Sequence, residues 1–167
     1  ILVTFSLIIF SGYVFASSML LVHFQKFTLE YSGPTRGAIE YASQSHPQTD
    51  LFFSSNMNDA ILHYAYYTRL NPAEYQEFAE YSPVDSGGFS HPKRYKNVYM
   101  ESESMQTPMC KYQDMKRDFL YISLSESADF AALNRPPVYR YPSFDGQSYL
   151  AYVYHFDPKQ SVVTPCK

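Results

Sequence analysis

The first 22 residues form one hydrophobic run without a charged side chain. The run reads ILVTFSLIIFSGYVFASSMLLV, and the first full charge after it is Lys26. About 20 apolar residues, each rising ~1.5 Å along a helix, are enough to cross the hydrocarbon core of a bilayer. The hydroxyl side chains in the run can bond back to carbonyls of the same helix. The pattern therefore predicts a transmembrane helix, with the membrane exit complete by about residue 31.

Two other interpretations of this run fit it less well. A signal peptide has a basic start and a shorter apolar core, and a buried helix of a soluble protein rarely stays free of charge for so long. Aromatic side chains follow the run at helical spacing (Phe24, Phe27 and Tyr31), as is typical of a membrane interface. The chain begins with Ile1 rather than Met, so we expect a fragment or a processed product.

Beyond residue 31 the pattern changes to short segments with helix or strand periodicity. Ser-Gly-Pro at 32–34 breaks the first helix, and an amphipathic helix is predicted from Pro34 to Ser45. The apolar run LFFSS, Leu51 to Ser55, is bounded by polar residues and predicts a buried strand. We expect Asn56 or Asn58 to cap the helix that follows.

The segment HYAYYTRLNPAEYQEF, His63 to Phe78, predicts a helix, a sharp corner and a second helix. Asn71-Pro72-Ala73-Glu74 supplies a cap, a proline at the first helical position and an acid at the third. The second helix is predicted to end at about Tyr81. The tyrosines flank an apolar stripe, which favours core packing with the hydroxyls at the rim.

The second half of the chain predicts strands separated by polar loops. The stretch 82–117 is rich in Gly, Pro and Ser, with one predicted strand at 96–101, and a clearer strand follows at 117–125. ADFAAL (128–133) predicts a helical turn, and PVYRYPSF and SYLAYVYHF alternate as the two strands of a hairpin. The predicted fold class is therefore α/β: a transmembrane helix (1–31) followed by one small mixed α/β domain (32–167) with a partly parallel sheet.

The charge balance excludes one large class of partners. Lys and Arg number 13 and Asp and Glu 16, so the formal net charge is −3. A nucleic-acid-binding face gathers enough cations to neutralise several phosphates. The one small basic cluster, HPKRYK (91–96), is interpreted as a solvated loop. We therefore expect no nucleic-acid partner.

Motifs that carry known chemistry are absent or incomplete in this sequence. VDSGGF (84–89) is similar to the nucleophile segment of chymotrypsin-like proteases, but the chain is too short for the two barrels of that fold. The histidines stand at no metal-ligand spacing, so we expect no metal site. No acidic pair is singled out for acid–base work, and we assign no catalytic residue and no cofactor to this chain.

Polar residues directly after the first predicted strand are the candidate binding residues. In open α/β sheets, ligands bind beyond the carboxyl ends of the strands. The candidates for contact with an acceptor substrate are Ser54, Ser55, Asn56 and Asn58. The alternative is that these residues only cap the following helix.

The sequence contains two cysteines, Cys110 and Cys166. If the domain lies outside the cytoplasm they can pair, and the closed loop would contribute about 4 kcal/mol of stability in the chain-entropy estimate. Two free thiols are the equal alternative.

Residues Phe15 to Gln76 resemble a known family of membrane enzymes. The resemblance comprises an apolar helix with an aromatic exit, GAIEYA, DLFFSS and ILHYAYYTRLNPAEYQ. The residues that match the family's most specific phrase are Tyr64, Tyr67, Pro72, Tyr75 and Gln76. This pattern is similar to the C-terminal part of polytopic bacterial glycosyltransferases of the GT-C type, such as protein mannosyltransferases and lipid A aminoarabinose transferases.

The resemblance implies a membrane enzyme that moves a sugar from a polyprenyl-phosphate carrier to an extracytoplasmic acceptor. It implies that residues after about 31 lie outside the cytoplasm and help to shape the acceptor side of the site. In that family the catalytic acids lie in the first extracytoplasmic loop, which this sequence does not contain. The implied partners are membrane lipid and, through an earlier part of the parent protein, the lipid-linked sugar.

Two alternatives belong to other functional classes. One is a singly anchored extracytoplasmic binding module without catalysis. The other is a pilin-like structural subunit, but pilins carry a Glu early in the apolar helix, whereas position 5 is Phe5 and the first acid is Glu30. The sequence therefore favours the glycosyltransferase over both.

Overall fold

The structure is a computed structural model that describes most of the chain after the hydrophobic run. The described residues are 11, 13, 14, 17, 33–57, 59–101, 118–132, 134–143 and 145–158. Most of the predicted span, Asn58 and both cysteines lie outside these ranges. The expectations that Asn58 contacts an acceptor and that Cys110 and Cys166 can pair therefore stay predictions.

Within the hydrophobic run, Ser11, Tyr13, Val14 and Ser17 are helical. The Ser17 hydroxyl donates a 3.0 Å hydrogen bond to the Val14 carbonyl, which is the back-bonding expected of hydroxyls in this run. Among the residues that the structure describes, none of the helices combines the length and the apolar character needed to cross a membrane.

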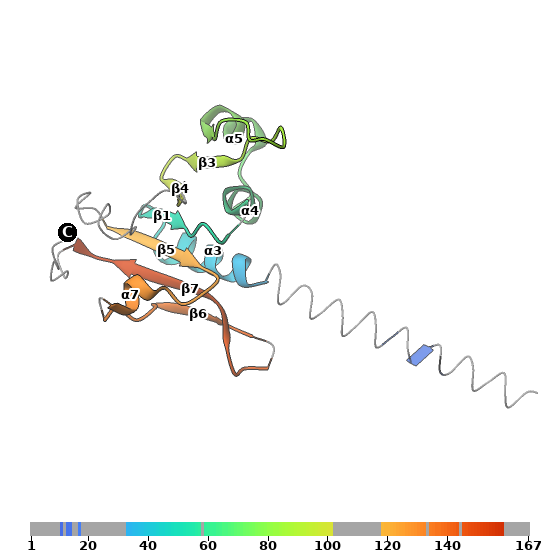
Figure 1. Ribbon diagram of the computed structural model, residues 1–167, viewed down its shortest axis with the longest axis vertical. Coiled ribbons are helices and arrows are strands. Elements are labelled where there is room, and N and C mark those ends of the chain that lie inside the picture. The colour runs from blue at the N-terminus through green and yellow to red at the C-terminus, as the bar shows by residue number, and fades with distance from the viewer. Residues whose placement is uncertain are drawn as a thin grey trace, which may run out of the picture.

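The described part of the domain is built on one mixed sheet of seven strands (Figure 1). The strands are β1 (Asp50–Phe53), β2 (Ala79–Tyr81), β3 (Pro92–Tyr95), β4 (Val98–Met100), β5 (Phe119–Ser123), β6 (Tyr139–Pro142) and β7 (Tyr149–Phe156). They lie in the order β2-β3-β4-β1-β5-β7-β6. β1 is parallel to its two neighbours β4 and β5, and the other pairs are antiparallel. The predicted α/β class and partly parallel sheet are confirmed.

Helices cover both faces of this sheet, because the central strands are apolar on both sides (Figure 1). Leu51 and Phe53 of β1 pack into a core with α3 (Gly33–Ser45) and α4 (Ala60–Tyr67). Phe52, between them, points to the opposite face and joins the core around Phe130 of α7 (Ala128–Ala132). Such a run without polar alternation is typical of a parallel strand buried on both faces.

Several local predictions are confirmed by the structure. The helix predicted from residue 34 is α3, and the predicted hairpin is the antiparallel pair β6 and β7. Asn71 caps α5 (Pro72–Phe78), with its side-chain oxygen 2.9 Å from the Ala73 N–H and Pro72 in the first turn. The Asn71 side chain stabilises this corner because it accepts a hydrogen bond from the Ala73 N–H, which has no partner within the helix.

Three local predictions were wrong. The second helix ends at Phe78 rather than Tyr81, because residues 79–81 pair with β3. The basic segment at 91–96 contains β3, because Tyr95 is buried in the core while Lys93 and Arg94 stay exposed. The N-cap of α4 is Asp59 rather than Asn56 or Asn58, and its side chain makes no capping bond.

The first residues of α3 lie at the edge where β4, β1 and β5 end, called here the carboxyl edge. Gly37 packs against Tyr141, close to the end of β6, and β6 runs in the same direction as β5. At the other end of the helix, the ring of His46 lies 5.0 Å from the ring of His155, which pairs with Leu120 early in β5. The chain therefore enters the domain at the carboxyl edge.

Candidate functional site

Polar residues collect at the carboxyl edge because three parallel strands end there together. Glu101 follows β4, Ser54 to Asn56 follow β1, and Ser123 ends β5 with Ser125 just beyond it. The register places Phe53 of β1 beside Met100 and Ile122, so the next residues of all three strands emerge at the same level. This edge is where open α/β sheets bind ligands.

Glu101 is the acceptor around which one side of this edge is arranged. Its Oε2 accepts a 2.8 Å hydrogen bond from the Tyr121 hydroxyl and a 3.4 Å contact from the Ser55 N–H. The Glu101 N–H donates to the Phe53 carbonyl at 2.8 Å, which continues the β4 ladder by one residue. The carboxylate is therefore held across the end of β1, and its second oxygen adds acceptor capacity.

Asn56 connects the ends of β1 and β5. Its side-chain N–H donates to Ser125 Oγ at 3.1 Å, and both residues are exposed. Ser54 is only 7% exposed, and its carbonyl accepts from the Met57 N–H at 3.0 Å. Ser54 therefore closes the turn after the strand, whereas Ser55 and Asn56 face solvent. We call Ser55, Asn56, Glu101, Tyr121 and Ser125 the glutamate cluster.

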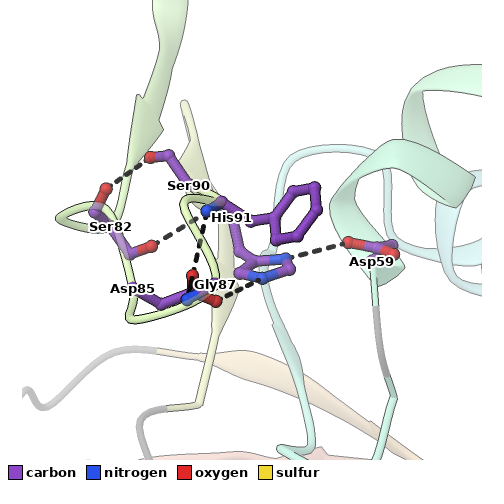
Figure 2. Close-up of polar contacts among 7 residues, drawn as sticks. Asp59, Ser82, Asp85, Gly87, Ser90 and His91 are labelled. Carbon is purple, nitrogen blue, oxygen red and sulfur yellow. Dashed lines mark hydrogen bonds and ion pairs between the residues drawn. The ribbon is translucent and has the colours of Figure 1, made fainter.

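A second cluster lies on the α4 side of the same edge (Figure 2). His91, directly before β3, has its Nδ1 3.4 Å from Asp59 Oδ1 and its Nε2 3.6 Å from Asp85 Oδ2. Its backbone N–H donates to Ser82 Oγ at 3.0 Å. Figure 2 shows the ring between the two carboxylates. We call Asp59, Ser82, Asp85 and His91 the histidine cluster.

The histidine cluster borders a cavity of about 400 Å³. Its lining consists of Asp59, Ser82, His91, Pro92, Lys93 and Met100. Asp59 adopts a left-handed backbone conformation, with φ at 54°, and its carboxylate faces His91 rather than capping α4. Such a conformation costs a non-glycine residue on the order of 1 kcal/mol, and strain of this kind is concentrated at functional sites.

Hydrogen bonds favour the ionised form of Asp85 in the histidine cluster. The Phe89 N–H, with further help from the Gly87 N–H and His91, lowers the pKa of Asp85 below that of an ordinary aspartate. An ionised carboxylate can accept hydrogen bonds from the hydroxyl groups of a ligand. A carboxylate beside an imidazole also orients the ring, so that the imidazole can donate a hydrogen bond to the same ligand. Among the described residues, no three His, Cys, Asp or Glu side chains are grouped to hold a metal ion.

The sequence placed its candidate residues after β1, and it missed the charged groups that the structure brings to the same edge. Of the four predicted residues, Ser55 and Asn56 lie in the glutamate cluster, Ser54 is a buried turn residue, and Asn58 is outside the described ranges. Glu101 and His91 were missed because both lie in the stretch 82–117, where the sequence carries little periodicity. The available signals were a strand ending in an acid and the Gly-Gly turn before His91.

Comparisons with protein-family models, curated proteins and solved structures gave no match to this chain.

Proposed function

We propose that residues 32–167 are the acceptor-side, saccharide-binding domain of a membrane glycosyltransferase of the GT-C type, and that the carboxyl edge is its binding site. One observation carries the proposal: two clusters of carboxylate, amide, hydroxyl and imidazole groups lie at this edge, and the histidine cluster borders a cavity of about 400 Å³. Sugars present many hydroxyls, each a donor and an acceptor, and such a mixed set of side chains satisfies both roles.

The direction of α3 supports this proposal. The predicted span precedes Gly33, and α3 begins at the carboxyl edge. A domain that follows the membrane helix in this way turns its candidate site toward the bilayer, where a lipid-linked sugar is held. We place the domain on the extracytoplasmic side, and protease digestion of sealed vesicles from outside tests that placement.

The proposal gives the described residues a binding role and leaves the transfer chemistry to the rest of the parent enzyme. Glu101 and Asp59 accept hydrogen bonds from sugar hydroxyls, Asn56 donates and accepts, and each ring nitrogen of His91 donates or accepts according to the tautomer. Stacking of a sugar ring on exposed tyrosines would add to affinity, but it would not select between sugars that differ in their hydroxyl groups.

The direct test is a sugar-binding measurement on the full chain in nanodiscs. Saturation-transfer NMR with a panel of hexoses, pentoses and amino sugars identifies binders, and calorimetry gives the Kd. We expect Glu101→Gln and Asp59→Asn each to weaken binding about tenfold or more, since each removes charge-assisted hydrogen bonds. Glu80→Gln is the matched control, because Glu80 pairs with Arg94 on the exposed surface of β2 and β3.

Two outcomes contradict the proposal. Absence of binding to every sugar in the panel removes the saccharide role, and binding that the edge variants leave unchanged moves the site elsewhere. Sugar binding by a chain whose full coding region contains only one membrane span supports the second candidate, an anchored binding module without catalysis.

A further inference from the structure

The loop between β2 and β3, residues 82–91, is a rigid turn. Asp85 Oδ1 accepts from the Gly87 N–H at 2.8 Å and the Phe89 N–H at 2.9 Å. The backbone closes the same turn, since the Asp85 N–H donates to the Phe89 carbonyl at 2.8 Å. Gly88 has φ at +85°, a conformation that glycine adopts without strain. Figure 2 shows this turn around Asp85 and Gly87.

The rigid turn presents two large apolar side chains to solvent. Val84 is 68% exposed and Phe89 is 67% exposed, and Phe89 is part of the hydrogen-bonded turn. Folding the Phe89 side chain inward would break the hydrogen bonds that close the turn. Two exposed apolar side chains on one turn offer a contact whose burial in another apolar phase is favourable.

The turn projects from the carboxyl edge. β2 ends at Tyr81 and β3 begins at Pro92, beside Met100, which lines the cavity at that edge. α3 begins at the same edge, directly after the charge-free run that the sequence predicts to cross the bilayer. The loop and the membrane-proximal end of the chain therefore share one side of the domain.

We propose that the loop 82–91 inserts Val84 and Phe89 into the interfacial layer of the lipid bilayer, as a second membrane contact beside the predicted span. The polar atoms of the turn satisfy one another, so the backbone can approach the headgroups without losing hydrogen bonds. The loop itself, residues 82–91, carries no Lys or Arg. The loop also carries the ionised, exposed Asp85, so it offers no attraction to anionic lipid, and the contact that we propose is made by the apolar side chains of Val84 and Phe89.

The chain contains no tryptophan, so one substitution gives a single fluorescent reporter. We would reconstitute the full chain carrying Phe89→Trp into phosphatidylcholine vesicles, with and without brominated acyl chains. Phe78→Trp is the matched control. Phe78 is 46% exposed and lies under Lys96 at the turn before β4, on the opposite edge of the sheet.

The expected result is a blue-shifted emission for the Trp at position 89, with about half of its intensity lost in brominated vesicles, because an interfacial side chain sits at the boundary of the acyl chains. The control should emit at the water-exposed wavelength without quenching. Raising the salt concentration should leave both results unchanged. Asp85→Ala in the Phe89→Trp background should reduce the quenching, since the turn loses two of its hydrogen bonds.

Vesicle flotation, run on the same samples, separates failure of this inference from failure of the membrane premise. A chain that floats while the Trp at position 89 stays unquenched overturns the inference and leaves the anchored domain intact. A chain that does not float overturns both. A blue-shifted but unquenched Trp would show that the side chain is buried against protein, either a second copy of the chain or another part of the parent protein. That outcome also overturns the inference. Sugar binding is tested separately through Glu101 and Asp59, which lie outside the loop 82–91.

Discussion

The Tyr121 hydroxyl donates a 2.8 Å hydrogen bond to Glu101 Oε2 and so joins β5 to the residue after β4 across the end of β1. Both side chains project from the same face of the sheet as Phe52, which lies between them in the strand order. The bond orients the carboxylate that we assign to the binding site and anchors it to a buried ring.

Tyr121→Phe tests the contribution of this bond to stability. The substitution removes the hydroxyl but keeps the packing of the ring, and a hydrogen bond to a charged group contributes about 1.5–3 kcal/mol. Since Glu101 is partly exposed, we expect the lower part of that range, a loss of about 1.5 kcal/mol in the free energy of unfolding. Urea unfolding measures the change.

The control for this substitution is Tyr149→Phe, because Tyr149 is among the exposed tyrosines. A double-mutant cycle with Glu101→Gln isolates the pairwise term. Equal losses for Tyr121→Phe in the wild-type and Glu101→Gln backgrounds would show that the bond carries no stability of its own.

Gly37→Ala should destabilise the packing of α3 on β6. A Cβ at this position would lie 2.6 Å from Tyr141 Cδ2 and 3.0 Å from the Tyr139 hydroxyl. Overpacking costs about 1–3 kcal/mol, while alanine in place of glycine favours a helix by about 1 kcal/mol. We expect a net loss of about 1 kcal/mol in the free energy of unfolding.

Removing the Tyr141 ring should relieve the destabilisation caused by Gly37→Ala. In a Tyr141→Ala background the closest contact disappears and only the 3.0 Å approach to the Tyr139 hydroxyl remains, so Gly37→Ala should become close to neutral. Thermal unfolding of the four variants tests this, and a Gly37→Ala loss that persists in full without the Tyr141 ring would refute contact with Tyr141 as its cause.

Alkaline pH should destabilise the domain through its buried tyrosines. Burial raises the pKa of Tyr154, although a 2.9 Å hydrogen bond from the Ser127 N–H opposes the shift, and burial raises the pKa of Tyr64 as well. The folded state therefore favours the neutral phenol. The contribution of these tyrosines to stability is complete below their unfolded pKa of about 10, and it is lost as pH rises through the higher folded pKa.

Phenolate absorbance, followed together with circular dichroism, measures this titration. Tyr64 and Tyr154, whose pKa values are raised by burial, should ionise only as the fold is lost. Tyr154→Phe should make stability fall less steeply in this pH range. A single titration step with the fold intact would contradict the prediction.

Acid should open the loop 82–91 before it unfolds the domain. The Phe89 N–H lowers the pKa of Asp85, so the ionised side chain stabilises the folded turn above the unfolded pKa. That stabilisation is lost as pH falls through the lowered folded value, below about pH 4. Carbon NMR of the Asp85 carboxyl group reports its titration, and amide exchange at Gly87 and Phe89 reports the opening.

Asp85→Asn provides the comparison for the acid experiment. The amide oxygen can still accept a hydrogen bond, but it does not titrate. The protection of the Gly87 and Phe89 amides, corrected for the pH dependence of intrinsic exchange, should therefore no longer change with pH in this range. An Asp85 carboxyl that titrates at or above the ordinary value would contradict the assigned role of these bonds.

Local sequence signals were sufficient to predict several elements of this protein. The run LFFSS predicted β1, the Asn-Pro-Ala-Glu corner predicted the start of α5, and the alternating C-terminal segments predicted the β6–β7 hairpin. These predictions hold because each depends on interactions between residues close in the chain: caps, turn residues and the alternation of buried side chains. The same logic placed Ser55 and Asn56 at a strand end.

Only the tertiary structure decided which polar groups meet. Ser55 and Glu101 are 46 residues apart, Asn56 and Ser125 are 69 apart, and Asp59 and His91 are 32 apart. Their meeting depends on the order of strands in the sheet, which is set by the burial of both faces of β1 and not by any local signal. The same strand order explains why the basic segment before Asn97 forms strand β3. Burial of the Tyr95 side chain stabilises the strand, while Lys93 and Arg94 remain exposed to solvent.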